Sequence, residues 1–281
     1  MHETIAIVFD FDDTLAPDST SGFLNCCGIN VPKFWKDDVQ PLLDDGWDPI
    51  PAYLYKMIEK SNNGECTDAT KDNFESWGKE MPLYEGVETI FDRLRDVARK
   101  KNPRVSLEFY LVSSGIRDIL KYTKIANQFN EIWASNFVYD DGGKIKFPKN
   151  IVSFTDKTRY IFHVQKGLFG SDFCGKPFDV NKKFDDSNIR VPLNQMIVVG
   201  DGYTDIPCFS LVRKAGGIAI GVYDQENRDK WGRAWGFIED GRVSNLVPAD
   251  YSEKSALSNS LVMAVESIAN KIALATHTYQ G

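Results

Sequence analysis

Residues 4–15 read TIAIVFDFDDTL, an apolar run that ends in three carboxylates within four positions. The almost continuous apolar character of residues 4–9 is typical of a strand that is covered on both faces in a parallel sheet. Asp10 and Asp12 follow it two positions apart, so they can face the same side, whereas Asp13 is expected to point away as a turn or cap residue. Because adjacent carboxylates repel each other, this stretch also predicts a compensating cation.

Strand-like runs recur at wide intervals along the chain, in residues 4–9, 106–112, 195–200 and 216–222. Helical patterns lie between them. The clearest covers residues 86–100, where apolar side chains repeat at the helical period on one face. Alternating strands and helices predict an α/β fold, here a Rossmann-like parallel sheet with helices on both sides.

One interval is too long for a simple crossover between strands. Residues 17–84 contain helix-like pieces at 32–43, 51–60 and 68–80, separated by Pro, Gly and Asn. We interpret this interval as an inserted, mainly helical cap domain, with residues 1–16 and 85–281 forming the core. Turn dipeptides also predict two β-hairpins, at residues 137–147 and 236–245.

Composition narrows the classes of partner and the compartment. A net charge of −7 and the lack of a dominant basic face argue against nucleic-acid binding. The first residues lack the features of a secretory signal, and the apolar stretch 261–275 carries Glu266 and Lys271 and is too short to span a bilayer. Five irregularly spaced cysteines, including the adjacent pair Cys26 and Cys27, favour reduced thiols. We expect a cytoplasmic protein without a nucleic-acid or membrane partner. The oligomeric state and the role of the cysteine pair stay open.

Polar residues follow three of the predicted strands, at the edge of the sheet where ligands bind in parallel α/β folds. They are Asp10, Asp12 and Thr14 after the first strand, Ser113 and Ser114 after the second, and Asp201 and Asp205 after the third. Four carboxylates in one cleft require a compensating cation. Since the three histidines are scattered, all-oxygen ligation of a hard ion is expected, and we predict Mg²⁺. A carboxylate beside Mg²⁺ with a hydroxyl and an ammonium suits phosphoryl transfer.

The sequence resembles the haloacid dehalogenase-like (HAD) superfamily of phosphohydrolases, from about residue 4 to residue 222. FDFDDTL fits the first motif, Asp-x-Asp-x-Thr, and LVSSG, which ends at Gly115, fits the second. Lys157 in SFTDKTRYIF fits the third motif, and VVGDGYTDIP fits the fourth, Gly-Asp-x-x-x-Asp. The first and fourth motifs are the specific ones. The cap interval lies where this superfamily places a helical cap, between motifs one and two.

The resemblance implies roles for the residues of the first two motifs. Asp10 would be the nucleophile that becomes an aspartyl-phosphate. Asp12 would be the general acid and then the general base, and its backbone carbonyl would bind Mg²⁺. Ser113 would donate a hydrogen bond to the phosphoryl group, with Ser114 as the alternative. Further candidate contacts to the substrate are Thr14 and Gly115.

The third and fourth motifs imply the remaining charges of the site. Lys157 would balance the charge of nucleophile and phosphate, although Lys144, Lys146, Lys149 and Lys166 lie nearby in sequence. Metal ligation is implied for Asp201, and Asp205 would orient a metal-bound water or Lys157.

Asp12 also points to the reaction, because the acid at this position is kept in the phosphatases of the superfamily, and an alkoxide leaving group needs a proton. We therefore predict a Mg²⁺-dependent phosphatase that hydrolyses a small phosphomonoester. Phosphoserine phosphatases carry a Glu shortly after motif one, where this chain has Ser19 beside Asp18, which argues against phosphoserine. The alternatives are a phosphotransferase with the same intermediate, a signalling receiver domain and a non-catalytic phospho-ligand binding protein. In receivers the acceptor Asp follows a later strand than the acidic pair, which is not the order here.

Overall fold

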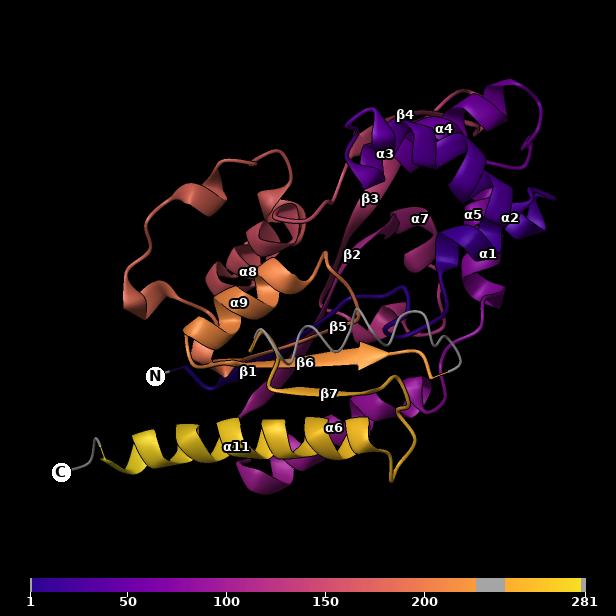
Figure 1. The fold of residues 1–281 in the computed structure, drawn as a ribbon. Coiled ribbons are helices and arrows are strands. Elements are labelled where there is room, and N and C mark those ends of the chain that lie inside the picture. Colours follow the sequence, from indigo (N-terminus) through magenta and orange to yellow (C-terminus); the bar gives the residue numbers. More distant parts are fainter. Residues whose placement is uncertain (1, 226–240, 279–281) are drawn as a thin grey trace.

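The computed structural model of this chain describes residues 2–225 and 241–278. Its described strands form one sheet in the order β4-β3-β2-β1-β5-β6-β7 (Figure 1). Their bounds are β1 Thr4–Phe9, β2 Ser106–Ile116, β3 Glu131–Tyr139, β4 Ile145–Asn150, β5 Met196–Gly200, β6 Ile218–Tyr223 and β7 Asn245–Pro248. All neighbouring pairs are parallel except β3 and β4. The predicted Rossmann-like α/β sheet is confirmed.

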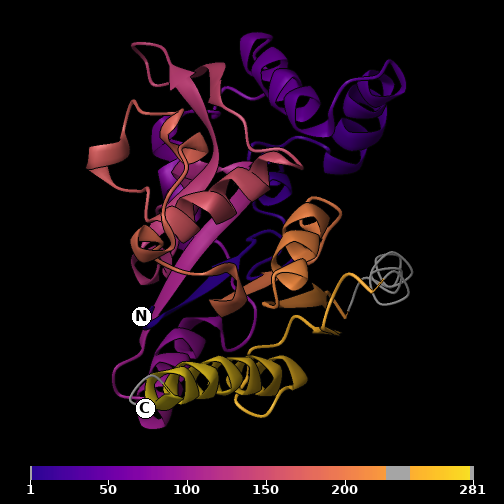
Figure 2. The same ribbon diagram turned by 90° about the vertical axis from the view of Figure 1, so that its left-hand side faces the viewer.

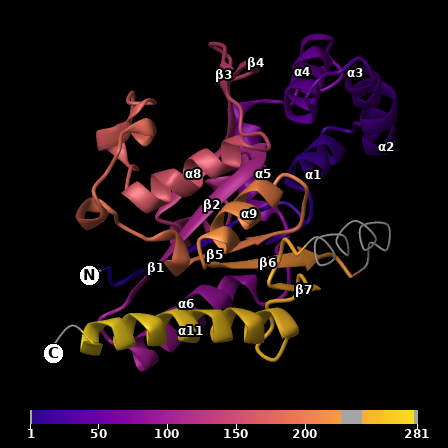
Figure 3. The ribbon, with the colours of Figure 1, turned by 60° about the vertical axis from the view of Figure 1, so that its left-hand side comes forward.

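The central strand β1 is buried on both faces, as its apolar run predicts. Ile5 and Ile7 pack into one core cluster, and Ala6 and Val8 pack into another, because successive side chains of a strand point to opposite faces. Helices α6 (Val87–Lys101) and α11 (Ala256–Thr278) pack together on the first face, and α8 (Asp156–Lys166) and α9 (Ile206–Lys214) cover the second (Figures 1 and 3).

The interval between β1 and α6 is helical, as predicted. It contains α1 (Ser19–Cys26), α2 (Val31–Lys33), the π-helix η1 (Phe34–Val39), α3 (Gln40–Asp44), α4 (Pro49–Asn62) and α5 (Lys71–Glu80). Helices α4 and α5 match two of the predicted pieces. The third piece, 32–43, is instead divided into α2, η1 and α3, with Pro32 and Pro41 in the first turns of α2 and α3. In all three views α2, α3 and α4 lie far from α11 (Figures 1, 2 and 3).

The hairpin predicted at residues 137–147 is confirmed, since β3 and β4 are antiparallel and Asp140 N donates to Lys144 O at 2.9 Å. It also contacts the helical interval, where Lys71 N donates to Gly143 O at 2.8 Å and Ile145 N donates to Ala69 O at 3.1 Å. Half of the hairpin predicted at 236–245, residues 236–240, lies outside the described residues.

The other helical elements among the described residues are short. They are α7 (Arg117–Leu120) and the 3₁₀ turns η2 (Ala126–Gln128), η3 (Ser171–Phe173), η4 (Asp179–Asn181), η5 (Asp186–Asn188) and η6 (Leu193–Gln195). Within the described ranges, no helix is both long enough and apolar enough to cross a bilayer.

Candidate active site

Strand register brings the predicted residues together at one edge of the sheet. Phe9 at the end of β1 is paired with Leu111 of β2 on one side and with Val199 of β5 on the other. The residues that follow Phe9, Leu111 and Val199 therefore lie side by side at the same edge of the sheet. The structure thus confirms the expected meeting of motifs one, two and four at the carboxyl ends of the strands.

A cavity of about 460 Å³ opens at this edge. Five of the predicted residues line it: Asp10, Asp12, Ser113, Ser114 and Asp201. Its wall also contains Asp13 and four residues that the sequence did not single out, namely Phe154, Gly202, Tyr203 and Thr204. Three of them are the variable positions of motif four, so the motif itself could have indicated them. Nothing in the sequence pattern marks Phe154.

Asp10 is buried at the tip of β1, where its backbone N donates to Val199 O at 2.9 Å. Its Oδ1 accepts a hydrogen bond from Phe11 N at 2.8 Å, and its Oδ2 lies 2.9 Å from the Nζ of Lys157. Burial, and next the charge of Asp205, raise the pKa of Asp10 to about 7, although Lys157 opposes this shift. In the absence of a further cation, this carboxylate is therefore costly to keep ionised.

Lys157 is the predicted motif-three lysine, and it lies in α8, where its side chain contacts Asp10 and Asp205. It is fully buried, and its Nζ lies 2.8 Å from Asp205 Oδ1 as well as 2.9 Å from Asp10 Oδ2. The two neighbouring carboxylates raise its pKa against the effect of burial. Lys166, one of the alternatives in sequence, instead donates to the carbonyls of Val180 and Lys182.

Asp205 lies behind Lys157 rather than in the cavity wall. Its Oδ2 accepts a hydrogen bond from Gly202 N at 3.1 Å, which joins the two ends of the motif-four turn. A Cβ at Gly200 would lie 2.5 Å from the Asp205 carboxylate, so this close approach requires glycine. The prediction that Asp205 orients Lys157 agrees with this geometry.

The carboxylates of Asp10, Asp201 and Asp205 each offer an oxygen within 4.8 Å of the others. The ammonium of Lys157 is paired with two of them, Asp10 and Asp205. This all-oxygen set fits a hard divalent cation such as Mg²⁺. The carboxylate of Asp12 is not in the set, and ligation by its backbone carbonyl stays a prediction.

Asp12 is held by the start of helix α1, because Ser19 N donates to its Oδ1 at 2.7 Å. Burial, and next the charge of Asp18, raise the pKa of Asp12 to about 8. A Cβ on Gly115 would lie 2.7 Å from Asp12 Oδ2, so glycine at the predicted position allows this approach. The carboxyl is thus positioned and biased toward its protonated form at neutral pH, as a general acid requires.

Asp13 occupies the turn after motif one with a φ of 56°, a left-handed conformation that Asp tolerates better than most residues. The expected turn role is confirmed. Asp13 does not point away from the site, however, because it lines the same cavity as Asp10 and Asp12. The expectation assumed that the strand alternation continues, whereas the chain already turns at this residue.

The two serines of motif two have different environments. Ser113 is buried and its Oγ accepts a hydrogen bond from Gly115 N at 3.0 Å. Ser114 accepts a hydrogen bond at its carbonyl from Tyr53 OH at 2.7 Å, while its buried Oγ has no partner among the described residues. Both line the cavity, so either hydroxyl can reach a ligand there.

Thr14 is fully buried and is not among the residues found in the cavity wall. Its carbonyl accepts a hydrogen bond from Tyr251 OH at 2.9 Å, which ties the turn to the segment before α11. Its predicted contact with substrate stays a prediction.

A second contact between α4 and the core lies near the site, in addition to the hydrogen bond from Tyr53 to Ser114. Asp48, the N-cap of α4, accepts hydrogen bonds from Ser153 Oγ at 3.0 and 3.1 Å. Ser153 directly precedes Phe154 of the cavity wall. Together with the bond from Tyr53 to Ser114, this contact places α4 beside the predicted site.

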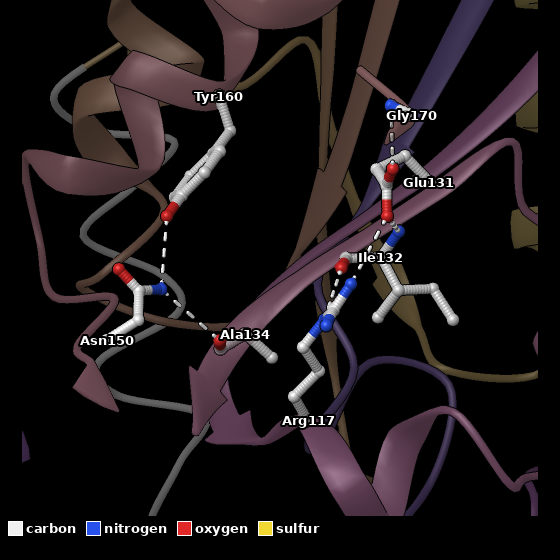
Figure 4. Close-up of polar contacts among 7 residues, drawn as sticks. All are labelled: Arg117, Glu131, Ile132, Ala134, Asn150, Tyr160 and Gly170. Carbon is white, nitrogen blue, oxygen red and sulfur yellow. Dashed lines mark hydrogen bonds and ion pairs between the residues drawn. The ribbon is translucent and has the colours of Figure 1, made fainter. Parts of the chain in front are cut away.

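A separate cavity of about 260 Å³ contains none of the predicted site residues. Figure 4 shows its polar contacts: Arg117 Nε donates to Ile132 O at 3.1 Å, and Glu131 accepts from Gly170 N at 3.2 Å. Asn150 lies within 3.3 Å of Tyr160 OH. Asn150 Nδ2 also donates to Ala134 O at 3.5 Å, so these contacts join α7, β4 and the turn after α8 to strand β3 and have a structural role.

The cysteine pair of the sequence is not a unit in the structure. All five cysteines carry free thiols. Cys26 is exposed, and the thiol of Cys27 forms a hydrogen bond with Cys66, between α4 and α5, which raises the pKa of Cys27.

Comparison with known proteins supports the same architecture. No family model matches the sequence. An uncharacterized protein from Borreliella burgdorferi is 25% identical over 282 residues, covering 91% of this chain and 94% of the relative. A HAD family hydrolase from Salmonella enterica serovar Typhi superposes with a TM-score of 0.57 at 12% identity, covering 94% of this chain and 71% of that one. A phosphoserine phosphatase solved as a phospho-aspartyl intermediate analogue superposes with a TM-score of 0.50 at 18% identity, covering 92% and 98%.

This chain has a HAD-type, phosphoserine-phosphatase-like fold. A phosphoserine phosphohydrolase-like protein from Francisella tularensis has the same fold, with a TM-score of 0.50 at 16% identity, over 91% of this chain and 98% of that one. The HAD-type fold predicted from the four motifs is confirmed.

Proposed function

We propose that this chain is a Mg²⁺-dependent phosphatase that hydrolyses a small phosphomonoester through an aspartyl-phosphate on Asp10. The observation that carries the proposal is the arrangement of Asp10, Lys157 and Asp205, with the ammonium 2.9 and 2.8 Å from the two carboxylates, of which Asp10 lines the cavity. Asp201 lies close enough to share a cation with them. The fold shared with HAD hydrolases and phosphoserine phosphatases supports the same reaction class.

In the first half-reaction, Asp10 Oδ attacks phosphorus, and the bond between phosphorus and the ester oxygen breaks. Asp12 gives its proton to that oxygen, so the product alcohol leaves neutral. The pKa of Asp12, raised to about 8 chiefly by burial, favours the protonated form that this step needs. Asp10, Asp201 and Asp205 would hold Mg²⁺, which when bound would supply positive charge that stabilises phosphoryl transfer.

In the second half-reaction, water attacks phosphorus and gives its proton to Asp12, which restores the starting carboxyl, while the bond from Asp10 to phosphorus breaks. Lys157 holds Asp10 and balances its charge in both steps. The serines of motif two donate to the phosphoryl oxygens. Helices α1 to α5 act as the cap that excludes water during the first step. The partner is a small phosphorylated metabolite in the cytoplasm.

The test is phosphate release from p-nitrophenyl phosphate by the purified protein, with Mg²⁺ or with chelator. Asp10→Asn is expected to abolish turnover, and Asp12→Asn to slow it at least about a hundredfold. Asp13→Asn is the matched control, because it removes the same charge from the same turn and Asn tolerates the φ of 56°; it should keep the rate within about tenfold. Full activity of Asp10→Asn would disprove the nucleophile.

A phosphotransferase would form the same intermediate, so a second measurement is needed. Acid-quenched protein should carry a phosphoryl group on Asp10, detected by mass spectrometry, and Asp10→Asn should carry none. Added alcohols should leave the yield of inorganic phosphate unchanged if water is the acceptor. A transfer product that replaces phosphate would favour the phosphotransferase.

A further inference from the structure

The cavity that Asp10 and Ser113 line, which we call the catalytic cavity, has a buried end and an open end. Asp10 and Ser113 are 7% and 0% exposed, whereas Tyr203 in the same wall is 52% exposed. Since Asp10 is the proposed nucleophile, the phosphoryl group of the substrate occupies the buried end. The alcohol portion of the ester therefore extends toward the open end, where Tyr203 lies.

Two aromatic residues, Phe154 and Tyr203, belong to the wall of the catalytic cavity. Phe154 comes shortly before α8, which begins at Asp156, and Tyr203 comes shortly before α9, which begins at Ile206. Helices α8 and α9 pack against each other (Figure 3). Two segments that are far apart in the sequence therefore bring an aromatic ring each to the same cavity.

These two rings do not help to build the hydrophobic core. The two clusters of buried apolar residues in the described part of the chain, and the partly buried residues packed against them, include neither Phe154 nor Tyr203. In contrast, Tyr160 of α8 and Phe209 of α9 are both in one of these clusters. Aromatic surface that stays accessible to water costs free energy in proportion to its area, and in a cavity wall it is typical of a ligand site.

The backbone that carries each ring is fixed by hydrogen bonds. The carbonyl of Phe154 accepts a hydrogen bond from Lys157 N at 3.3 Å, in the first turn of α8. Tyr203 lies in the motif-four turn, which the hydrogen bond from Gly202 N to Asp205 Oδ2 closes at 3.1 Å. Because this backbone is already ordered, a ligand that covers the two rings loses little affinity to ordering of the protein.

We propose that Phe154 and Tyr203 bind the alcohol portion of the substrate, so that the phosphatase acts on the phosphate ester of an alcohol that carries an aromatic ring. This inference rests on the proposed phosphatase function. The cavity volume of about 460 Å³ corresponds to roughly fifteen water molecules at about 30 Å³ each, which is enough for a phosphoryl group and one ring. Offset or edge-to-face contacts between aromatic rings add to the gain from burial alone, so a flat ring is favoured over an aliphatic group of the same size.

The test compares kcat/KM with Mg²⁺ for benzyl phosphate, cyclohexylmethyl phosphate and ethyl phosphate. All three esters release primary alcohols of similar acidity, so a difference between them reports on binding of the alcohol portion. Benzyl phosphate should exceed ethyl phosphate by at least about tenfold, from burial of the ring, and cyclohexylmethyl phosphate by at least about threefold, from the aromatic contacts. A benzyl ester that is no better than the ethyl ester, or no better than the cyclohexylmethyl ester, would overturn the inference while leaving the phosphatase intact.

Substitutions then assign the preference to the two rings. Phe154→Ala and Tyr203→Ala should each lower the ratio of kcat/KM for benzyl phosphate to that for ethyl phosphate by at least about threefold, a ratio that a general loss of activity does not change. Tyr203→Phe keeps the ring and should keep the ratio. Phe178→Ala is the control, since it removes a ring that is 79% exposed and lies outside the catalytic cavity. An unchanged ratio in both Phe154→Ala and Tyr203→Ala would refute the role of these rings.

If no ester is hydrolysed, the proposed function fails, and calorimetry then decides the binding inference separately. The Asp10→Asn protein, titrated with benzyl phosphate and with ethyl phosphate in Mg²⁺, should bind the benzyl ester at least about tenfold more tightly. Equal affinities would overturn the inference.

Discussion

Replacement of Lys157 by Met tests the charge balance on which the site depends. The variant removes the ammonium that lies between Asp10 and Asp205 but keeps a buried side chain of similar length. At 2.9 Å and an effective dielectric near 20, each ion pair attracts by about 6 kcal/mol, and the desolvation of three buried charges offsets much of this. Breaking a buried pair by removing one partner costs about 3–5 kcal/mol, and we expect a loss of that size.

The loss of stability in Lys157→Met should also depend on pH, in a direction that the pKa shifts determine. The pKa of Lys157 is raised, so its contribution is complete below its ordinary value near 10.4 and is constant between pH 5 and pH 8. The pKa of Asp10 is raised to about 7 in the folded protein. Between about pH 4 and pH 7, Asp10 is therefore protonated in the folded protein but ionised in the unfolded chain, and the free energy of unfolding falls as the pH rises through this range. Removing Lys157 raises the pKa of Asp10 further. The loss of stability in the variant should therefore be larger at pH 8 than at pH 5.

The assay is urea unfolding followed by circular dichroism, in chelator, at both pH values, together with phosphate release in Mg²⁺. We expect Lys157→Met to lower the rate at least about a hundredfold, because the nucleophile is no longer held. Lys146→Met is the control: this exposed lysine lies nearby in sequence, and its replacement should change stability by no more than about 0.5 kcal/mol and leave the rate unchanged. A Lys157→Met protein that is as stable as the original at pH 8 and fully active would refute the reasoning.

Two further substitutions test contacts around the site and the core. Gly115→Ala would place a methyl group 2.7 Å from Asp12 Oδ2 and should lower kcat/KM by about ten- to a hundredfold. Gly142→Ala is the control, because the nearest atom to its new methyl group is 3.4 Å away, and it should keep the rate. Equal activity of the two variants would count against the importance of the contact at Gly115. Arg190→Met should lower the free energy of unfolding by about 1–3 kcal/mol, because the buried carboxylate of Glu108 loses its charged donor, and phosphate release at 25 °C should not change. Urea unfolding measures this second effect. A change in the free energy of unfolding smaller than about 0.5 kcal/mol would mean that water replaces the arginine.

The strands and the motif residues at their tips were predictable because the signals are local. The apolar run of β1 and the residues that directly follow it are neighbours in the chain, and a parallel sheet puts all such ends on one edge. The same reasoning failed at Asp13, where the chain turns, and at residues 32–43, which divide into three helical segments. Helix α1 was missed because its short sequence carries little helical periodicity.

The sequence by itself determined the HAD-type architecture and the acidic residues at the tips of the strands. Only the tertiary structure decided which of five neighbouring lysines pairs with Asp10, and that Phe154 and Tyr203 lie in the wall of the same cavity as Asp12. The physical reason is that periodicity and turn chemistry act between residues close in the chain. The partners of a buried charge, in contrast, are chosen by the packing of segments that lie far apart in it.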